Sequence, residues 1–140
     1  MPQSGIVFHL GDFSFGSCPD IVKNLTGKII LIQGNHDKIE KDFRASFHMI
    51  IDYAELSFRK GEINDFFCCS HYPMMRWNKS HYGSFMLHGH EHGNINHLNK
   101  DFNRLDVSYD SRRMLAAKDK DFTNNFGHPE DIWSYIDLIN

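Results

Sequence analysis

Four apolar runs of this sequence end in turns that carry side chains able to bind metals. The chain has 10 His among its 140 residues, and histidine is the commonest metal ligand in proteins. The four turns are Gly11-Asp12, Gly34-Asn35-His36-Asp37, Ser70-His71-Tyr72-Pro73 and Gly89-His90-Glu91-His92. Because ligands of α/β sheets gather beyond the carboxyl ends of strands, these turns could converge on one site.

Each turn by itself also has a structural interpretation. Gly-Asp is an ordinary turn pair, Asn35 suits a tight turn, and backbone groups could satisfy His71. His90 and His92 are separated by one residue, so an extended segment would direct both to one side and Glu91 away. They could then bind one metal or two neighbouring metals. The four turns in this order, each after a predicted strand, favour a functional site.

Hydrophobic periodicity predicts an α/β protein. The predicted strands are Gly5–Leu10, Lys28–Ile32, Met49–Tyr53, Glu55–Arg59, Ile63–Cys69, Ser84–His88 and Leu105–Tyr109. Predicted helices begin near Pro19 and at Pro129, because proline favours the first helical position, and a short one covers Lys38–Arg44. Arg112-Arg113 is interpreted as a solvated turn.

Composition places the chain in a broad class. A length of 140 residues with 41% hydrophobic residues suits one domain, 1–140. The net charge of −3 argues against a nucleic-acid partner. No segment approaches the roughly 20 apolar residues of a membrane span, and no signal peptide is evident. Three cysteines, two of them adjacent, fit a reduced compartment, so we expect a cytoplasmic protein.

The four turns with their flanking residues resemble the successive motifs of the calcineurin-like metallophosphoesterases. The stretches His9–Phe13, Ser70–Pro73 and Gly89–Asn94 resemble a bacterial and phage branch of that superfamily. The resemblance covers roughly Ile6 to Asp110, and 111–140 is a divergent tail with a terminal helix. It implies a sandwich of two facing β-sheets flanked by helices.

The resemblance also implies a metal site. It implies two ions about 3.5–4 Å apart, the spacing of two-metal phosphatases. Asp12 would bridge both ions; Asn35, His71 and His90 would complete the second site, and His92 would bind the first. A mixed nitrogen and oxygen set with a bridging carboxylate suits Mn, Fe, Zn or Ni.

A catalytic pair and a reaction follow from the same resemblance. His36 would protonate the leaving oxygen or stabilise its charge, and Asp37 would orient its imidazole. The implied reaction is hydrolysis of a phosphate ester or phosphodiester by metal-activated hydroxide. The expected substrate is a small phosphorylated molecule.

The chain departs from the family at its N-terminus, because no Asp-x-His motif precedes Gly11-Asp12. The first site is thereby reduced to Asp12 and His92, so we expect one firmly bound ion and a second bound weakly or not at all. The first strand could belong to a longer chain of which this sequence is a part, another chain such as a second copy could fill its place, or the tail could fold back, where Phe122–His128 faintly echoes the motif. The alternative function is a catalytically impaired binding module that retains one metal.

Overall fold

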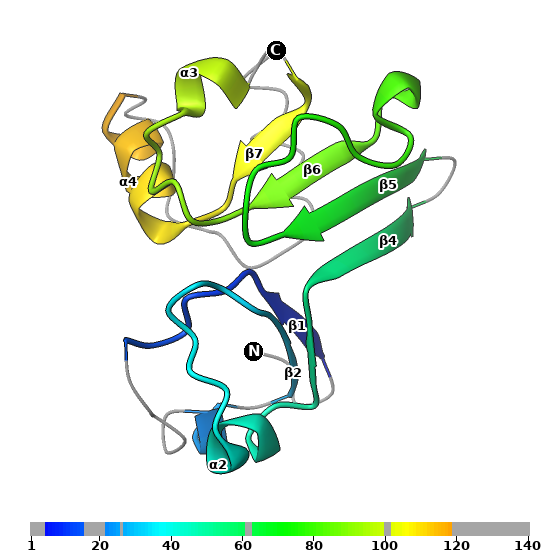
Figure 1. Ribbon diagram of the computed structural model, residues 1–140. Helices are drawn as coiled ribbons and strands as arrows, with labels where there is room; N and C mark the ends of the chain where they lie inside the picture. The colour runs from blue at the N-terminus through cyan, green and yellow to red at the C-terminus, as the bar shows by residue number, and fades with distance from the viewer. Residues whose placement is uncertain (1–4, 16–21, 26, 61–62, 100–101, 119–140) are drawn as a thin grey trace.

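The computed structural model describes residues 5–15, 22–25, 27–60, 63–99 and 102–118, which form an α/β protein with two mostly parallel sheets and short helices (Figure 1). The first sheet consists of three parallel strands, in the order β1 (Ile6–His9), β2 (Lys28–Ile32) and β3 (Met49–Ile51). The second sheet has the order β4 (Tyr53–Lys60), β5 (Ile63–Ser70), β6 (Phe85–His88) and β7 (Arg104–Asp106). β4 and β5 are antiparallel, whereas β5, β6 and β7 are parallel.

The central strands are apolar on both faces, as their sequences predict. In β2, Leu31 and Ile32 are adjacent and both fully buried. In β5, Cys68 and Cys69 are likewise adjacent and buried. Successive residues of a strand face opposite sides, so both faces of these strands are covered.

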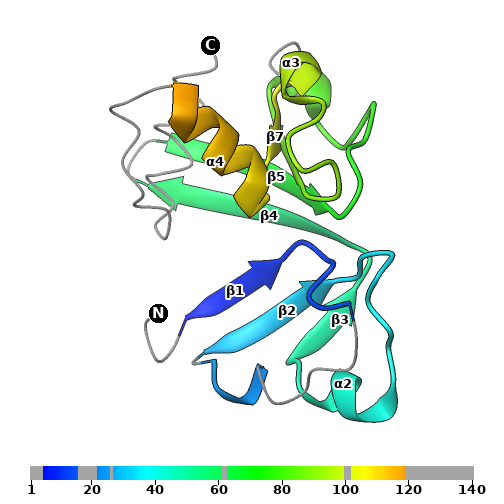
Figure 2. The same cartoon turned by 90° about the vertical axis from the view of Figure 1, so that its left-hand side faces the viewer.

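One hydrophobic cluster joins the two sheets. Ile32 of β2 packs with Phe67 and Cys69 of β5, Leu87 of β6 and Leu105 of β7. A second cluster, on the first sheet, includes Val22, Ile29, Leu31, Phe43 and Phe47. Figure 2 shows the chain passing from β3 of one sheet directly into β4 of the other. The shared cluster and this short connection fix the first sheet against the second.

The helices are short, and one of them corrects the sequence analysis. The helix predicted over Lys38–Arg44 is α2 (Lys41–Ala45), and α3 (Asn96–Asn99) and the 3-10 turn η1 (Ser80–Tyr82) lie in the second half. The strand predicted over Leu105–Tyr109 is wrong in its second half, because α4 (Tyr109–Lys118) begins there. Arg112 and Arg113 therefore lie in a helix, not in a turn.

Two short polar side chains explain this change from strand to helix. Asp106 accepts a hydrogen bond from the Ser108 backbone N–H (2.9 Å), which turns the chain at the end of β7. The Ser108 hydroxyl accepts one from the Ser111 N–H (3.3 Å), as a helix N-cap does. The helix predicted at Pro129 and the segment Phe122–His128 lie outside the described residues, as does most of the helix predicted near Pro19.

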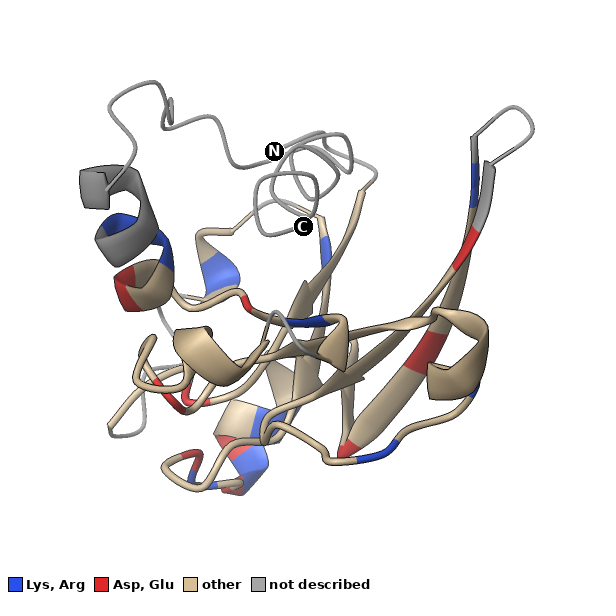
Figure 3. Cartoon of the chain, turned by 90° about the horizontal axis from the view of Figure 1, so that it is seen from above, with Lys and Arg blue, Asp and Glu red and all other residues tan. Residues whose placement is uncertain are grey.

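Strand β1 lies at one edge of the first sheet. Among the described residues, β1 has β2 as its sole strand neighbour. Figure 3 shows acidic and basic residues interspersed along the described elements. None of the described helices is long and apolar enough to cross a membrane.

Candidate metal centre

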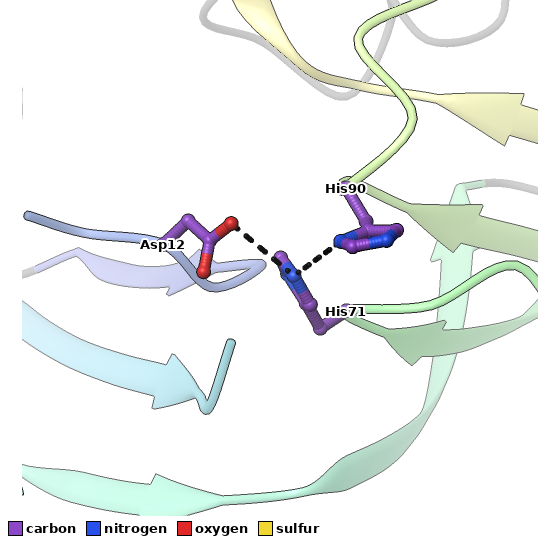
Figure 4. Close-up of side chains that lie close together, drawn as sticks. All are labelled: Asp12, His71 and His90. Carbon is purple, nitrogen blue, oxygen red and sulfur yellow. Dashed lines mark hydrogen bonds and ion pairs between the residues drawn. The ribbon is translucent and has the colours of Figure 1, made fainter. Parts of the chain in front are cut away.

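Four predicted metal ligands meet at the boundary between the two sheets. Asp12 and Asn35 follow β1 and β2 of the first sheet, and His71 and His90 follow β5 and β6 of the second. The Nε2 atom of His71 lies 3.4 Å from Asp12 Oδ2 and 3.2 Å from His90 Nδ1 (Figure 4). It also lies 3.0 Å from Asn35 Oδ1. The predicted convergence of these strand ends is therefore present in the structure.

The hydrogen bonding of His71 leaves its Nε2 atom facing oxygens of Asp12 and Asn35, an arrangement that needs a proton or a cation. His71 Nδ1 lies 2.8 Å from the Leu10 carbonyl oxygen, which can only accept, so Nδ1 carries a proton. In the neutral ring Nε2 then presents a lone pair, and it faces oxygens of Asp12 and Asn35. His90 Nδ1 can offer one proton at most. A cation among these atoms would satisfy all of them together.

Burial strengthens the case for a cation. His71 is 2% exposed and Asp12 is 15% exposed. Unsatisfied polar atoms removed from water cost free energy, so electron-rich atoms are rarely gathered without a proton or an ion among them. Asp12, His71 and His90 each offer one ligand atom. These three atoms lie within 4.8 Å of one another, so the group could hold a metal ion. The Asn35 oxygen is a fourth candidate ligand.

Glycines allow the turns to approach one another this closely. A Cβ atom on Gly11 would overlap His71 Nδ1, and Gly11 also has a φ of 90°, a conformation that L side chains rarely adopt. A Cβ atom on Gly34 would overlap the backbone nitrogen and Oδ1 of Asp12. On Gly89 it would come within 3.1 Å of the Leu10 carbonyl oxygen. Glycine is thus required at positions 11 and 34, where the turns touch, whereas a Cβ atom at position 89 would need only a small shift of its neighbour.

Asp37 joins the two turns of the first sheet. Its Oδ2 accepts hydrogen bonds from the backbone N–H groups of Asp12 (3.0 Å) and Gly34 (2.8 Å), and its Oδ1 accepts one from Phe13 (2.7 Å). The side chain is 6% exposed. The His36 N–H donates to Asp12 Oδ1 (2.9 Å), so Oδ2 of Asp12 is the oxygen directed at His71. These bonds fix the Asp12 carboxylate, a role for Asp37 that sequence reasoning missed.

The predicted catalytic role of His36 is not decided by this geometry. Its side chain is exposed, and its ring lies 4.7 Å from the ring of Phe15. Both oxygens of Asp37 are engaged by backbone N–H groups. That His36 donates a proton and that Asp37 orients it both stay predictions.

Buried polar groups hold the turn after β6. Asp106, fully buried, accepts a hydrogen bond from the Gly93 N–H (2.8 Å). His88, also fully buried, donates from Nδ1 to the Gly89 carbonyl (2.9 Å) and accepts from Asn99 at Nε2 (3.1 Å). Burial lowers the pKa of His88, which keeps the ring neutral in this pair of bonds. In the sequence, Asp106 stands between the apolar residues Leu105 and Val107, an alternation that predicts a solvent-facing side chain, so the local pattern did not reveal its burial.

The expectation of an extended segment over His90 and His92 is wrong. The two residues have φ values of 65° and 49°, so the chain turns tightly between them. Both nevertheless line a cleft of about 370 Å³, together with His9, Asp12, His71 and Asp110. His92 lies outside the group formed by Asp12, His71 and His90, and its Nδ1 is 2.7 Å from Asp110 Oδ2.

Comparison with known proteins supports the fold. The chain is similar to the crystal structure of AQ665, a protein of unknown function from Aquifex aeolicus, with 26% sequence identity and a TM-score of 0.50. The match covers 64% of this chain and 57% of the Aquifex chain, so it spans little more than half of that protein. No family model matches the sequence. No curated protein matches it either.

Proposed function

We propose that this protein is a metal-dependent phosphoesterase with the sandwich fold of the calcineurin-like superfamily. One observation carries the proposal: Asp12, Asn35 and His90 meet around the Nε2 atom of His71. They follow four different strands, in the chain order that the resemblance implies. The substrate proposed is a small phosphate ester or phosphodiester.

The binding residues have distinct parts in this proposal. Asp12, Asn35, His71 and His90 would hold the ion, with the Asp12 carboxylate fixed by the His36 N–H. A divalent Mn, Fe, Zn or Ni ion bound there would supply Lewis acidity, which polarises a phosphoryl oxygen and acidifies water. Leu10 holds the His71 ring in the tautomer that presents Nε2 to the ion.

The reaction also needs a proton donor. Hydrolysis forms a bond from water oxygen to phosphorus, breaks the ester P–O bond and leaves the departing oxygen in need of a proton. We assign that proton to His36, which directly follows Asn35 and has an exposed ring. The cleft lined by Asp12, His71 and His90 has a volume of about 370 Å³, which is enough to admit a phosphoryl group beside these three side chains.

A catalytically impaired binding module is the second candidate function. It is favoured by the count of ligands, because His92 lies outside the group that Asp12, His71 and His90 form among the described residues. Such a protein would keep one ion and bind a phosphorylated ligand or a partner chain. Either proposal includes a cytoplasmic location and a second copy or a different partner chain at the β1 edge.

Hydrolysis of an activated phosphodiester tests the proposed function. Bis(p-nitrophenyl) phosphate would be incubated with the full chain and Mn²⁺, with His71→Ala as the site variant and His97→Ala as the control. His97 is an exposed histidine of α3 outside the cleft. We expect turnover in the wild type and the control and none in His71→Ala. Equal rates in all three proteins would refute the proposal, and tight Mn²⁺ binding without turnover would favour the binding module.

A further inference from the structure

A second histidine–carboxylate contact lies in the same cleft, outside the group around His71. His92 Nδ1 is 2.7 Å from Asp110 Oδ2, and the two side chains are 56% and 52% exposed. His92 belongs to the turn after β6, and Asp110 to the first turn of α4. Both residues line the cleft that contains Asp12, His71 and His90.

The contact determines which nitrogen of His92 carries a proton. An ionised carboxylate can only accept, so His92 Nδ1 is the donor. In the neutral ring the lone pair then lies on Nε2, the atom farther from Asp110. Histidines that bind metals almost always donate their other ring N–H to such a carboxylate or carbonyl group, as His71 does to Leu10.

A buried residue holds both members of the pair in place. Asp106 accepts hydrogen bonds from the N–H of Gly93, which adjoins His92, and from the N–H of Ser108, two residues before Asp110. Asp106 is fully buried. The turn that carries His92 and the start of α4 are therefore fixed to one carboxylate, and the exposed pair is less free than an ordinary surface contact.

We propose that Asp110 is a positioning residue, which holds His92 in the Nδ1-protonated tautomer and so presents its Nε2 to a second cation beside the ion at His71. The inference rests on the proposed function. It names Asp110 as the residue that supports His92 at the weaker ion position, beside the ion held by His71. His92 lies outside the group of Asp12, His71 and His90, so fewer clustered ligands are available to the ion beside His92, and we expect it to bind more weakly than the ion at His71.

The tautomer is measured without any metal. Long-range ¹H–¹⁵N correlation spectra of the metal-free protein, at a pH above the titration of its histidines, distinguish the two forms of each ring. We expect His92 to be protonated on Nδ1 in the wild type, to lose that preference in Asp110→Ala and to keep it largely in Asp110→Asn, whose amide oxygen can still accept. Wild-type His92 protonated on Nε2, or a tautomer unchanged in Asp110→Ala, would overturn the proposal.

Asp42→Ala is the matched control. Asp42 is also exposed and lies in the first turn of a helix, α2. Asp42→Ala therefore removes an exposed carboxylate from a first helical turn, as Asp110→Ala does, but at a site away from His92. Exposed pairs contribute little to stability, so Asp110→Ala should remain folded. His92 should have the wild-type tautomer in Asp42→Ala.

Calorimetric titration with Mn²⁺ then separates this inference from the proposed function. Two binding phases are expected, and Asp110→Ala should weaken the second by about 10–100-fold, as the loss of supporting contacts to a metal ligand does. The first phase should be unchanged in Asp110→Ala and lost in His71→Ala. A single phase in the wild type at saturating Mn²⁺ would overturn the inference and leave the ion at His71 intact. No binding at all would overturn both.

Discussion

The replacement of Asp37 by Asn tests whether this residue mainly builds the site. The carboxylate accepts three backbone N–H groups, from Asp12, Phe13 and Gly34. An amide has one oxygen and one NH₂ group, so whichever way it turns, an NH₂ group faces at least one of these N–H donors. The site is buried, and water cannot easily replace the lost acceptor.

The magnitude follows from these contacts. Hydrogen bonds to a charged group contribute about 1.5–3 kcal/mol each, and a buried donor left without a partner costs about 1–3 kcal/mol. We therefore expect Asp37→Asn to lower the free energy of unfolding by about 2–4 kcal/mol. With a urea dependence of about 2 kcal/mol per molar, the middle of the usual range for small proteins, the midpoint should fall by about 1–2 M.

Urea denaturation followed by circular dichroism provides the assay, with Asp42→Asn as the control. Asp42 is an exposed carboxylate of α2, and its replacement should change stability by less than about 0.5 kcal/mol. Mn²⁺ affinity should fall together with stability in Asp37→Asn, because Asp37 fixes the backbone of Asp12. A variant as stable as the wild type that loses turnover alone would contradict this reasoning, and would favour the predicted role of Asp37 in orienting His36.

Three further predictions concern other parts of the chain. Gly34→Ala should weaken Mn²⁺ binding measured by calorimetry and destabilise the fold by about 1–3 kcal/mol, because its Cβ atom would overlap Asp12; wild-type affinity would show that the turns can separate without loss. Cys69 should stay unmodified by iodoacetamide at neutral pH in peptide mapping, since burial raises the pKa of its thiol to about 12, and rapid alkylation of the native protein would contradict that burial. His36→Ala should lower turnover by about 10²–10⁴-fold and spare Mn²⁺ affinity, and an unchanged rate on an ester with a poor leaving group would exclude it as the proton donor.

Apolar runs and the turns after them were sufficient to predict much of the fold. The run Lys28–Ile32 predicted β2 with its bounds unchanged, because a strand buried on both faces is apolar throughout. The strand-end positions of Asp12, Asn35, His71 and His90 followed from the same logic. The end of β7 could not be predicted from apolarity, because hydrogen bonds of Asp106 and Ser108 with backbone N–H groups determine it.

The finer geometry of the site depended on contacts between distant residues. The spacing of His90 and His92 predicted an extended segment with both side chains on one side. Both residues instead have left-handed backbone conformations, so the chain turns tightly there. The pairing of His92 with Asp110 joins a turn to a helix that the sequence analysis did not predict. The three bonds of Asp37 likewise depend on how the two turns meet, which no local pattern specifies.

Anomalous diffraction from crystals grown with Mn²⁺ tests the central claim most directly. If the four residues form a metal centre, a strong anomalous peak will lie among Asp12 Oδ2, Asn35 Oδ1, His71 Nε2 and His90 Nδ1, at about 2.0–2.2 Å from each, as in other sites with nitrogen and oxygen ligands. Crystals of His71→Ala grown in the same way should lack the peak. A wild-type map without density among these atoms, or with the ion bound elsewhere, would contradict the claim.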